Sequence, residues 1–208
     1  SVIRELKNGI NSDINHSGID DVGDLLKYSY KVAGCVGLMM CDVLSIKDSL
    51  ARYYAIDLGI AMQLTNICRD VFIDHRDGRI YLPSTLLTGN EISSMTDDEI
   101  LKVVTKLIKL ADEYYNSALN GIIYIPIRSR FSILYALRLY QAIGHKILRQ
   151  KDKYFKEKIN TTLFEKILVF IKTSFEFSSM FFRSSANRKH NKNLHKSLHG
   201  LPYVNEAV

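Results

Sequence analysis

The chain has 208 residues, of which 47% are hydrophobic and 24% are charged, with three prolines and eleven glycines. This composition is typical of a globular domain with a sizeable core, and it excludes collagen-like, low-complexity and disordered chains. The formal net charge is +6, but five basic residues lie between 183 and 199 with no acid among them. The remainder is nearly neutral, so we expect no nucleic-acid partner.

Apolar residues recur with helical spacing along most of the chain, and no segment shows the alternation typical of a strand. We therefore predict an all-α protein. The expected helices cover residues 25–47, 49–75, 96–120, 126–150 and 161–185. The last of them carries a stripe of phenylalanine and aliphatic residues that we assign to the core. No apolar run reaches the length of a transmembrane helix.

Three signals mark the ends of these helices. The acidic cluster at 20–24 has a DDxxD pattern, but its place just before an apolar run favours a helix N-cap over a metal site. Asp77–Gly78 is expected to end the second helix. Thr96 and Glu99 have the spacing of a capping box at the start of the third.

The cysteines, Cys35, Cys41 and Cys68, lie on apolar helix faces. An odd number without zinc-type spacing indicates buried free thiols. This use of cysteine favours a reducing compartment, and we expect the cytoplasm.

The basic residues near the C-terminus divide the chain into a partial domain, 1–187, and a basic tail, 188–208. We expect the tail to be solvated. Contact with an anionic membrane surface is the alternative, which would place the protein at the periphery of a membrane. His190, His195 and His199 lie in this tail, and we expect no metal site there.

A polar stripe crosses the second expected helix. Gln63, Asn66, Asp70 and Asp74 follow one another at steps of three, four and four residues, so they share one face of a helix that is otherwise apolar. Buried amide and carboxylate oxygens need a partner. Mg²⁺ with a phosphate group is the natural one, because Mg²⁺ is bound by one or two carboxylates together with substrate phosphates.

The sequence around this stripe, QLTNICRDVFIDHRDGRIYLP at 63–83, resembles the second aspartate-rich motif of the squalene/phytoene synthase family. YSYKVAGCVGLMM at 28–40 is similar to that family's YxYxVAGxVG segment, with an ending most similar to phytoene synthases. LYQAIGHKI at 139–147 is similar to the helix that follows. The resemblance implies the isoprenoid-synthase helical bundle.

The family has a second metal-binding motif that precedes this one. Only 69 residues precede Asp70, too few to hold it. We therefore expect a fragment that lacks the N-terminal helices of the bundle and is inactive alone, with a natural short paralogue as the alternative.

The resemblance also implies an activity. It is the head-to-head condensation of two geranylgeranyl diphosphates to phytoene through a cyclopropyl diphosphate, with Mg²⁺ or alternatively Mn²⁺ as cofactor. The first alternative is squalene or dehydrosqualene synthesis from farnesyl diphosphate. The second is a non-catalytic homologue that acts as an assembly factor, which the intact metal-ligand stripe argues against.

The family pattern assigns roles to individual residues. The expected catalytic residues are Asp70, Asp74, Arg79 and Tyr28, and the expected metal ligands are Asn66, Asp70 and Asp74. The expected substrate-binding residues are Gln63, Arg69, Tyr140, Tyr81, Gly34 and Gly37.

Simpler explanations stand beside several of these roles. Arg79 could form a surface salt bridge, and Tyr28 and Tyr140 could be core tyrosines. Gly34 and Gly37 could serve close helix packing instead of a groove for a prenyl chain. Arg69 lies off the polar stripe, so its role rests on the resemblance.

Overall fold

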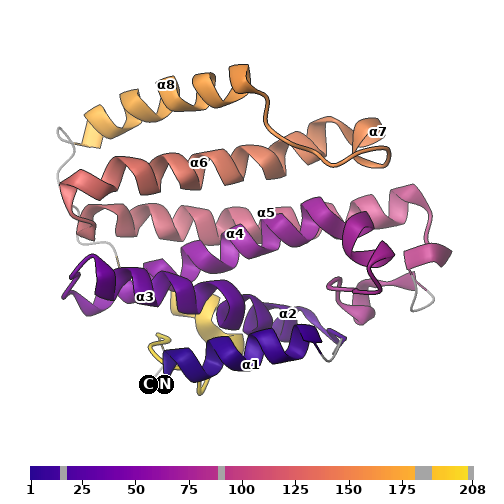
Figure 1. Ribbon diagram of the computed structural model, residues 1–208, viewed down its shortest axis with the longest axis horizontal. Coiled ribbons are helices and arrows are strands. Elements are labelled where there is room, and N and C mark those ends of the chain that lie inside the picture. The colour runs from indigo at the N-terminus through magenta and orange to yellow at the C-terminus, as the bar shows by residue number, and fades with distance from the viewer. Residues whose placement is uncertain (15–17, 89–91, 181–188, 206–208) are drawn as a thin grey trace.

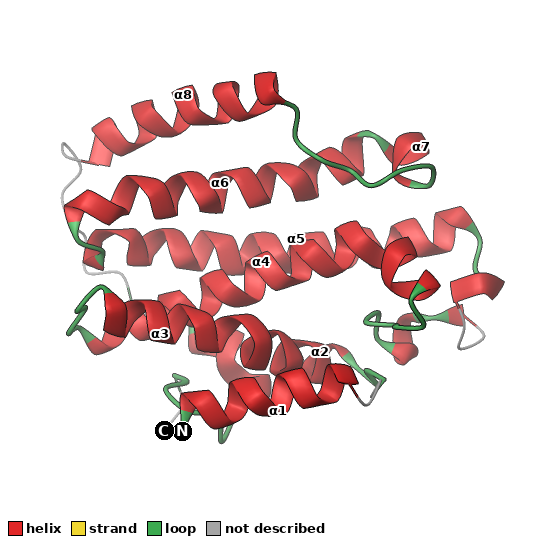
Figure 2. Ribbon diagram, in the orientation of Figure 1, coloured by secondary structure: helices red, strands yellow, loops and turns green. Residues whose placement is uncertain are grey.

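The computed structural model describes residues 1–14, 18–88, 92–180 and 189–205, and these residues contain helices but no strand (Figures 1 and 2). The α-helices are α1 (Val2–Ile14), α2 (Val22–Ser29), α3 (Cys35–Val43), α4 (Ser49–Arg76), α5 (Asp97–Gly121), α6 (Ile127–Arg149), α7 (Lys151–Tyr154) and α8 (Leu163–Met180). A π-helical turn, η1 (Tyr30–Gly34), joins α2 to α3, and a 3₁₀-helix, η6 (Lys192–Leu198), lies near the C-terminus. The all-α prediction is confirmed.

The helices stack in layers with α4 near the centre (Figure 1). On one side of α4 lie α5, α6 and then α8, and on the other lie α3, α2 and α1. α4 contacts α2, η1, α3, α5 and α6, and its buried residues form the middle of the hydrophobic core. Side chains on this one helix can therefore meet residues from both halves of the bundle.

Two glycines allow the backbone of α4 to approach the η1–α3 segment closely. A Cβ atom at Gly37 would overlap the carbonyl oxygen of Ala55, and one at Gly59 would overlap that of Ala33. Close helix packing at Gly37 is therefore present, and the substrate-binding role of Gly37 stays a prediction. The same approach leaves no room for any larger side chain along this contact.

Most helix ends fall where the sequence indicates them. Asp21 caps α2 by accepting a hydrogen bond from the backbone N–H of Asp24, so the acidic cluster is a cap as expected. The capping box of Thr96 and Glu99 is also present. The helix expected at 25–47 is interrupted by η1, where the N–H of Cys35 donates to the carbonyl of Tyr30.

α1 was not expected. Asparagine and glycine lower the helix propensity of this segment, and tertiary contact outweighs that preference. Gly9 lies against Val32 and Lys31, so α1 packs directly on the segment around η1.

The assignment of the α8 stripe to the core is wrong. Phe164 and Phe175 are 69% and 74% exposed. The opposite face of α8 packs on α6, where Arg138 forms a bidentate ion pair with Glu176, and a second ion pair lies near the start of α8. Charge pairing turns the polar face inward and the apolar stripe outward. The expected end of this helix, 181–185, lies outside the described residues.

The expectation of a solvated tail is wrong for residues 189–205. Leu194 and Leu198 are buried, η6 packs against α2, and two histidines are buried against Asp57 of α4. The lysines of the segment are exposed, while its apolar residues form a second side that is buried. The expected domain boundary between 187 and 188 falls outside the described residues and stays a prediction.

Two smaller expectations concern membranes and cysteines. Among the described residues, no helix combines the length and the apolar character that crossing a bilayer requires. All three cysteines are buried and unpaired, as predicted.

The close approach at Gly59 predicts a clear stability difference between two helical glycines. Gly59→Ala should destabilise the fold by about 1–3 kcal/mol, because the new Cβ meets backbone that cannot move aside. Gly144 is the matched control: its Cβ would make an ordinary 3.4 Å contact with Ile108. Gly144→Ala should be neutral or stabilising by up to about 1 kcal/mol. Urea unfolding measures both, and equal effects would contradict the packing described.

Candidate active site

The C-terminal half of α4 carries the polar stripe. The side chains of Asp70 and Asp74, one turn apart, are 18% and 17% exposed. Asn66 lies one turn before them, and its Oδ1 atom is buried without a hydrogen-bond partner. Gln63 is half-buried at the start of the stripe. An unpaired buried oxygen is costly, so this face can gain from an added donor or cation.

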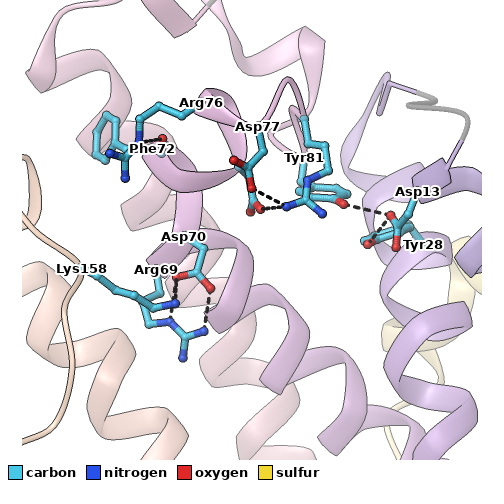
Figure 3. A network of polar contacts seen from close by, with 11 residues as sticks. Asp13, Tyr28, Arg69, Asp70, Phe72, Arg76, Asp77, Tyr81 and Lys158 are labelled. Atoms are coloured by element: carbon cyan, nitrogen blue, oxygen red, sulfur yellow. Dashed lines mark hydrogen bonds and ion pairs between the residues drawn. The ribbon is translucent and has the colours of Figure 1, made fainter.

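Asp70 is neutralised by two cations (Figure 3). Arg69 donates from Nε to Oδ1 at 3.0 Å and from Nη2 to Oδ2 at 2.6 Å, and Lys158 Nζ lies 2.9 Å from Oδ1. Burial raises the pKa of Asp70, but the hydrogen bonds from Arg69 and Lys158 outweigh it and hold that pKa below its usual value. Asp70 is therefore a carboxylate with two cations beside it.

Asp74 belongs to a second cluster at the end of α4. Gly78, with φ +75°, turns the chain back, and the N–H of Arg79 donates to the carbonyl of Asp74 at 2.8 Å. The Arg79 guanidinium lies 3.5 Å from the Asp74 carboxylate and 3.0 Å from that of Asp77. The salt bridge foreseen as the simpler explanation for Arg79 is thus present. Burial, with Asp70 and Asp77 adding to it, raises the pKa of Asp74 despite Arg79.

Tyr28 and Tyr81 form a stacked pair next to this cluster (Figure 3). Their ring centroids are 5.1 Å apart, with 22° between the planes. Both hydroxyls donate to Oδ1 of Asp13 in α1, at 2.8 Å and 3.0 Å. Burial raises the pKa of Tyr28, so its hydroxyl stays protonated. One carboxylate thereby joins α1, α2 and the loop after α4.

An apolar cavity of about 390 Å³ lies along the part of α4 that precedes the polar stripe. It lies between the η1–α3 segment, the N-terminal half of α4 and α6, and Gly37, Gly59 and Met62 line it. Gly59 precedes Asp70 by about 16 Å along the helix axis. A ligand with a charged head at Asp70 and a long apolar chain can therefore follow α4 into the cavity.

Of the other residues predicted to bind substrate, some lie at the candidate active site and others lie only in the hydrophobic core. Tyr140 packs half-buried against the core beside the Asp70 cluster. The hydrogen bond to Asp70 raises the pKa of Arg69, and the nearby Tyr140 adds to that shift. Arg69 therefore joins the site although it lies off the stripe. Gly34 faces the ring of Tyr30 and does not line the cavity.

Sequence reasoning missed Asp13 and Lys158. Asp13 lies at the end of the helix that was not expected. Lys158 lies in the lysine-rich stretch 151–158, where no spacing distinguishes it from its neighbours. Asp13 and Lys158 come close to the C-terminal end of α4 only in the folded chain.

Sequence comparison relates the chain to known enzymes. A family model described as squalene/phytoene synthase matches residues 1–165. A 15-cis-phytoene synthase from Paracoccus sp. is 39% identical over 166 residues, which is 78% of this chain and 55% of that protein. A 15-cis-phytoene synthase from Enterobacter agglomerans is 33% identical over 172 residues, or 80% of this chain and 58% of that protein. The chain spans about half the length of the curated relatives it matches.

Solved structures of similar fold agree with this relationship. The crystal structure of a dehydrosqualene synthase matches with a TM-score of 0.76 and 25% identity, covering 86% of this chain and 65% of that one. Squalene synthase HpnC from Alicyclobacillus acidocaldarius matches with a TM-score of 0.64 and 21% identity, covering 73% of this chain and 60% of that one. The second likeness concerns the fold alone.

The pairing of Asp70 predicts how its pKa responds to Lys158. Because the pKa of Asp70 is lowered in the folded state, the pairing stabilises the fold above the ordinary carboxyl pKa and is lost as the pH falls through the folded-state value. Lys158→Gln should raise the pKa of Asp70 and reduce this stabilisation. A carbon-13 NMR pH titration of the Asp70 carboxyl measures it. Lys156→Gln, an exposed neighbour, is the control and should change nothing. An unchanged pKa in Lys158→Gln would contradict the ion pair.

Proposed function

The chain belongs to the squalene/phytoene synthase family, and we propose that it carries the second aspartate-rich motif of a phytoene synthase. The reaction joins two geranylgeranyl diphosphates head to head. Its first step forms the cyclopropane ring of prephytoene diphosphate and releases one diphosphate and one proton. Its second releases the other diphosphate and a proton, which leaves phytoene. No oxidant or reductant is consumed.

The observation that carries this proposal is the unpaired, buried Oδ1 of Asn66, one turn from Asp70. With the carboxylates of Asp70 and Asp74 it makes a set of oxygen ligands that fits Mg²⁺, or Mn²⁺ in its place. The bound metal supplies charge neutralisation for the departing diphosphate. Gln63, one turn before Asn66, hydrogen-bonds to the diphosphate or to the waters around it.

Three cations are placed to hold the diphosphate itself. Arg69 and Lys158 lie beside Asp70, and Arg79 lies beside Asp74. The Nε–H of Arg79 is buried without a hydrogen-bond partner, so this guanidinium has a donor left for an anion. Guanidinium groups match phosphate oxygens in geometry and charge.

The apolar chain of the substrate follows α4 into the cavity, whose apolar lining holds the chain away from water. Tyr28 and Tyr140 offer aromatic faces near the diphosphate end, where a cation is stabilised by the ring. Tyr81 and Asp13 fix the orientation of the Tyr28 ring. Gly37 and Gly59 add no side chain to the cavity lining, which leaves room for the prenyl chain.

A dehydrosqualene or squalene synthase that uses farnesyl diphosphate is the second candidate. The likeness to the dehydrosqualene synthase structure, with a TM-score of 0.76, favours it. The two candidates share the diphosphate site and differ in the length of chain that the cavity accepts. For either one we propose the cytoplasm as the compartment, at the periphery of a membrane that takes up the apolar product.

The diphosphate site predicts a metal-dependent affinity. The chain should bind inorganic diphosphate when Mg²⁺ is present, as measured by isothermal titration calorimetry. Asp70→Asn and Asp74→Asn should each weaken this binding by at least about tenfold to a hundredfold, which is the loss typical when only an outer-shell partner of a metal ligand is changed. Asp77→Asn is the matched control on the same turn, and it should bind nearly as tightly as the wild type. Equal losses in all three variants would show a general charge effect and contradict the site.

The chain carries one of the two metal-binding motifs that the family resemblance implies. We therefore expect no turnover of geranylgeranyl or farnesyl diphosphate by these 208 residues alone in a product assay with Mg²⁺. Formation of a C40 or C30 hydrocarbon by the chain alone would overturn that expectation.

A further inference from the structure

A buried carboxylate lies on the face of α4 away from the diphosphate site. Asp57 is fully buried, and three donors meet its two oxygens. His190 Nε2 lies 2.8 Å from Oδ2, His195 Nε2 lies 3.0 Å from Oδ1, and Ser117 Oγ donates to Oδ2 at 2.5 Å. We call these four residues the clamp. Burial raises the pKa of Asp57, but the hydrogen bonds from the two histidines outweigh it and lower that pKa.

The hydrogen bonds on the far side of the two imidazole rings fix where their protons lie. The backbone N–H of Asn205 donates to His195 Nδ1 at 2.8 Å, so His195 carries its proton on Nε2 and donates to Asp57. The side-chain amide of Asn205 lies 2.9 Å from His190 Nδ1, which gives His190 the same tautomer. Each oxygen of Asp57 is thus met by an N–H.

This arrangement decides between a metal site and a hydrogen-bonded network. One nitrogen of each histidine and one oxygen of Asp57 lie within 4.8 Å of one another, which is close enough to consider a metal ion. A metal would need both Nε2 atoms deprotonated and both Nδ1 atoms protonated. A proton on His195 Nδ1 would then face the N–H of Asn205, donor against donor. The clamp is therefore a network of hydrogen bonds and not a metal site.

The clamp fastens residues 189–205, which we call the C-terminal strap, to the bundle. Other contacts of the strap reach separate elements. Tyr114 of α5 donates to the carbonyl of Leu194 at 2.6 Å, and Tyr30 of η1 donates to the carbonyl of Pro202 at 2.5 Å. The strap therefore connects the buried side of α4 to the π-helical turn.

We propose that Asp57 is a positioning residue, which holds η1 in its π-helical form through the C-terminal strap and the hydrogen bond between Pro202 and Tyr30. η1 begins directly after α2, the helix that contains Tyr28. π-Helical turns often lie at functional sites. The strap thus acts on the tyrosine end of the candidate site from the opposite side of α4. The consequence for catalysis rests on the proposed function, whereas the clamp itself does not.

The first test removes the acceptor. Asp57→Leu keeps the size of the side chain but leaves two buried N–H groups and a hydroxyl unpaired. Hydrogen exchange at the amides of 189–205 and of η1 should accelerate by about tenfold, because a buried donor without a partner favours local opening. Amides in the middle of α5 and α6 should not change. Asp112→Leu is the matched control, because Asp112 also pairs with a histidine, His145, but at the surface.

A milder variant keeps the test decisive if Asp57→Leu fails to fold. In Asp57→Asn the new NH₂ can face Ser117 and His190, provided that His190 moves its proton to Nδ1 and the Asn205 amide flips. His195 cannot follow, because its Nδ1 faces a backbone N–H. Long-range proton–nitrogen NMR should therefore show both rings protonated at Nε2 in the wild type, and only His190 switched in Asp57→Asn.

A third variant separates the strap from η1. Tyr30→Phe should accelerate exchange in η1 while both histidine rings keep their Nε2 protons. Faster exchange in the strap without any change in η1 for Asp57→Leu would overturn the positioning role. Zn²⁺-induced shifts of both ring nitrogens in the wild type would overturn the clamp in favour of a metal site. Absence of Mg²⁺-dependent diphosphate binding in the wild type would count against the proposed function alone, since the exchange and NMR results do not depend on it.

Discussion

The close contact between α4 and the η1–α3 segment is the constraint on which the rest of the structure depends. Gly37 and Gly59 let the two backbones meet with no side chain between them. Both glycines line the apolar cavity, and Tyr28 lies at the same end of the bundle as Asp77 (Figure 3). Because no free space remains between the two backbones, a small movement of either segment is transmitted to the other.

Different parts of α4 have different roles, both along the helix axis and around it. Its N-terminal half lines an apolar cavity, and its C-terminal half carries amide and carboxylate groups with cations beside them. An amphipathic ligand such as a prenyl diphosphate has the same division between head and tail. On a further face of the helix, Asp57 holds the C-terminal strap. One helix therefore contributes to the polar site, the apolar cavity and the anchoring of a remote segment.

The sequence predicted those features whose cause is local. The spacing of Asn66, Asp70 and Asp74 revealed the polar stripe, and the glycine at position 78 marked the turn that follows α4. The features it missed depend on contacts between distant parts of the chain. Lys158 reaches Asp70 across 88 positions only after folding. The strap looked solvated because its sequence is rich in lysine, whereas its two buried histidines pair with a carboxylate 133 and 138 positions away.

In the function proposed here, Asn66, Asp70 and Asp74 hold a metal-bound diphosphate whose prenyl chain fills the apolar cavity along α4. A crystal structure of the chain with Mn²⁺ and a thiolodiphosphate analogue of geranylgeranyl diphosphate tests it most directly, because anomalous scattering locates Mn²⁺ without ambiguity. We expect Mn²⁺ bonded to these three side chains and the C20 chain against Gly59. Mn²⁺ at the clamp, or a prenyl chain outside the cavity, would contradict it.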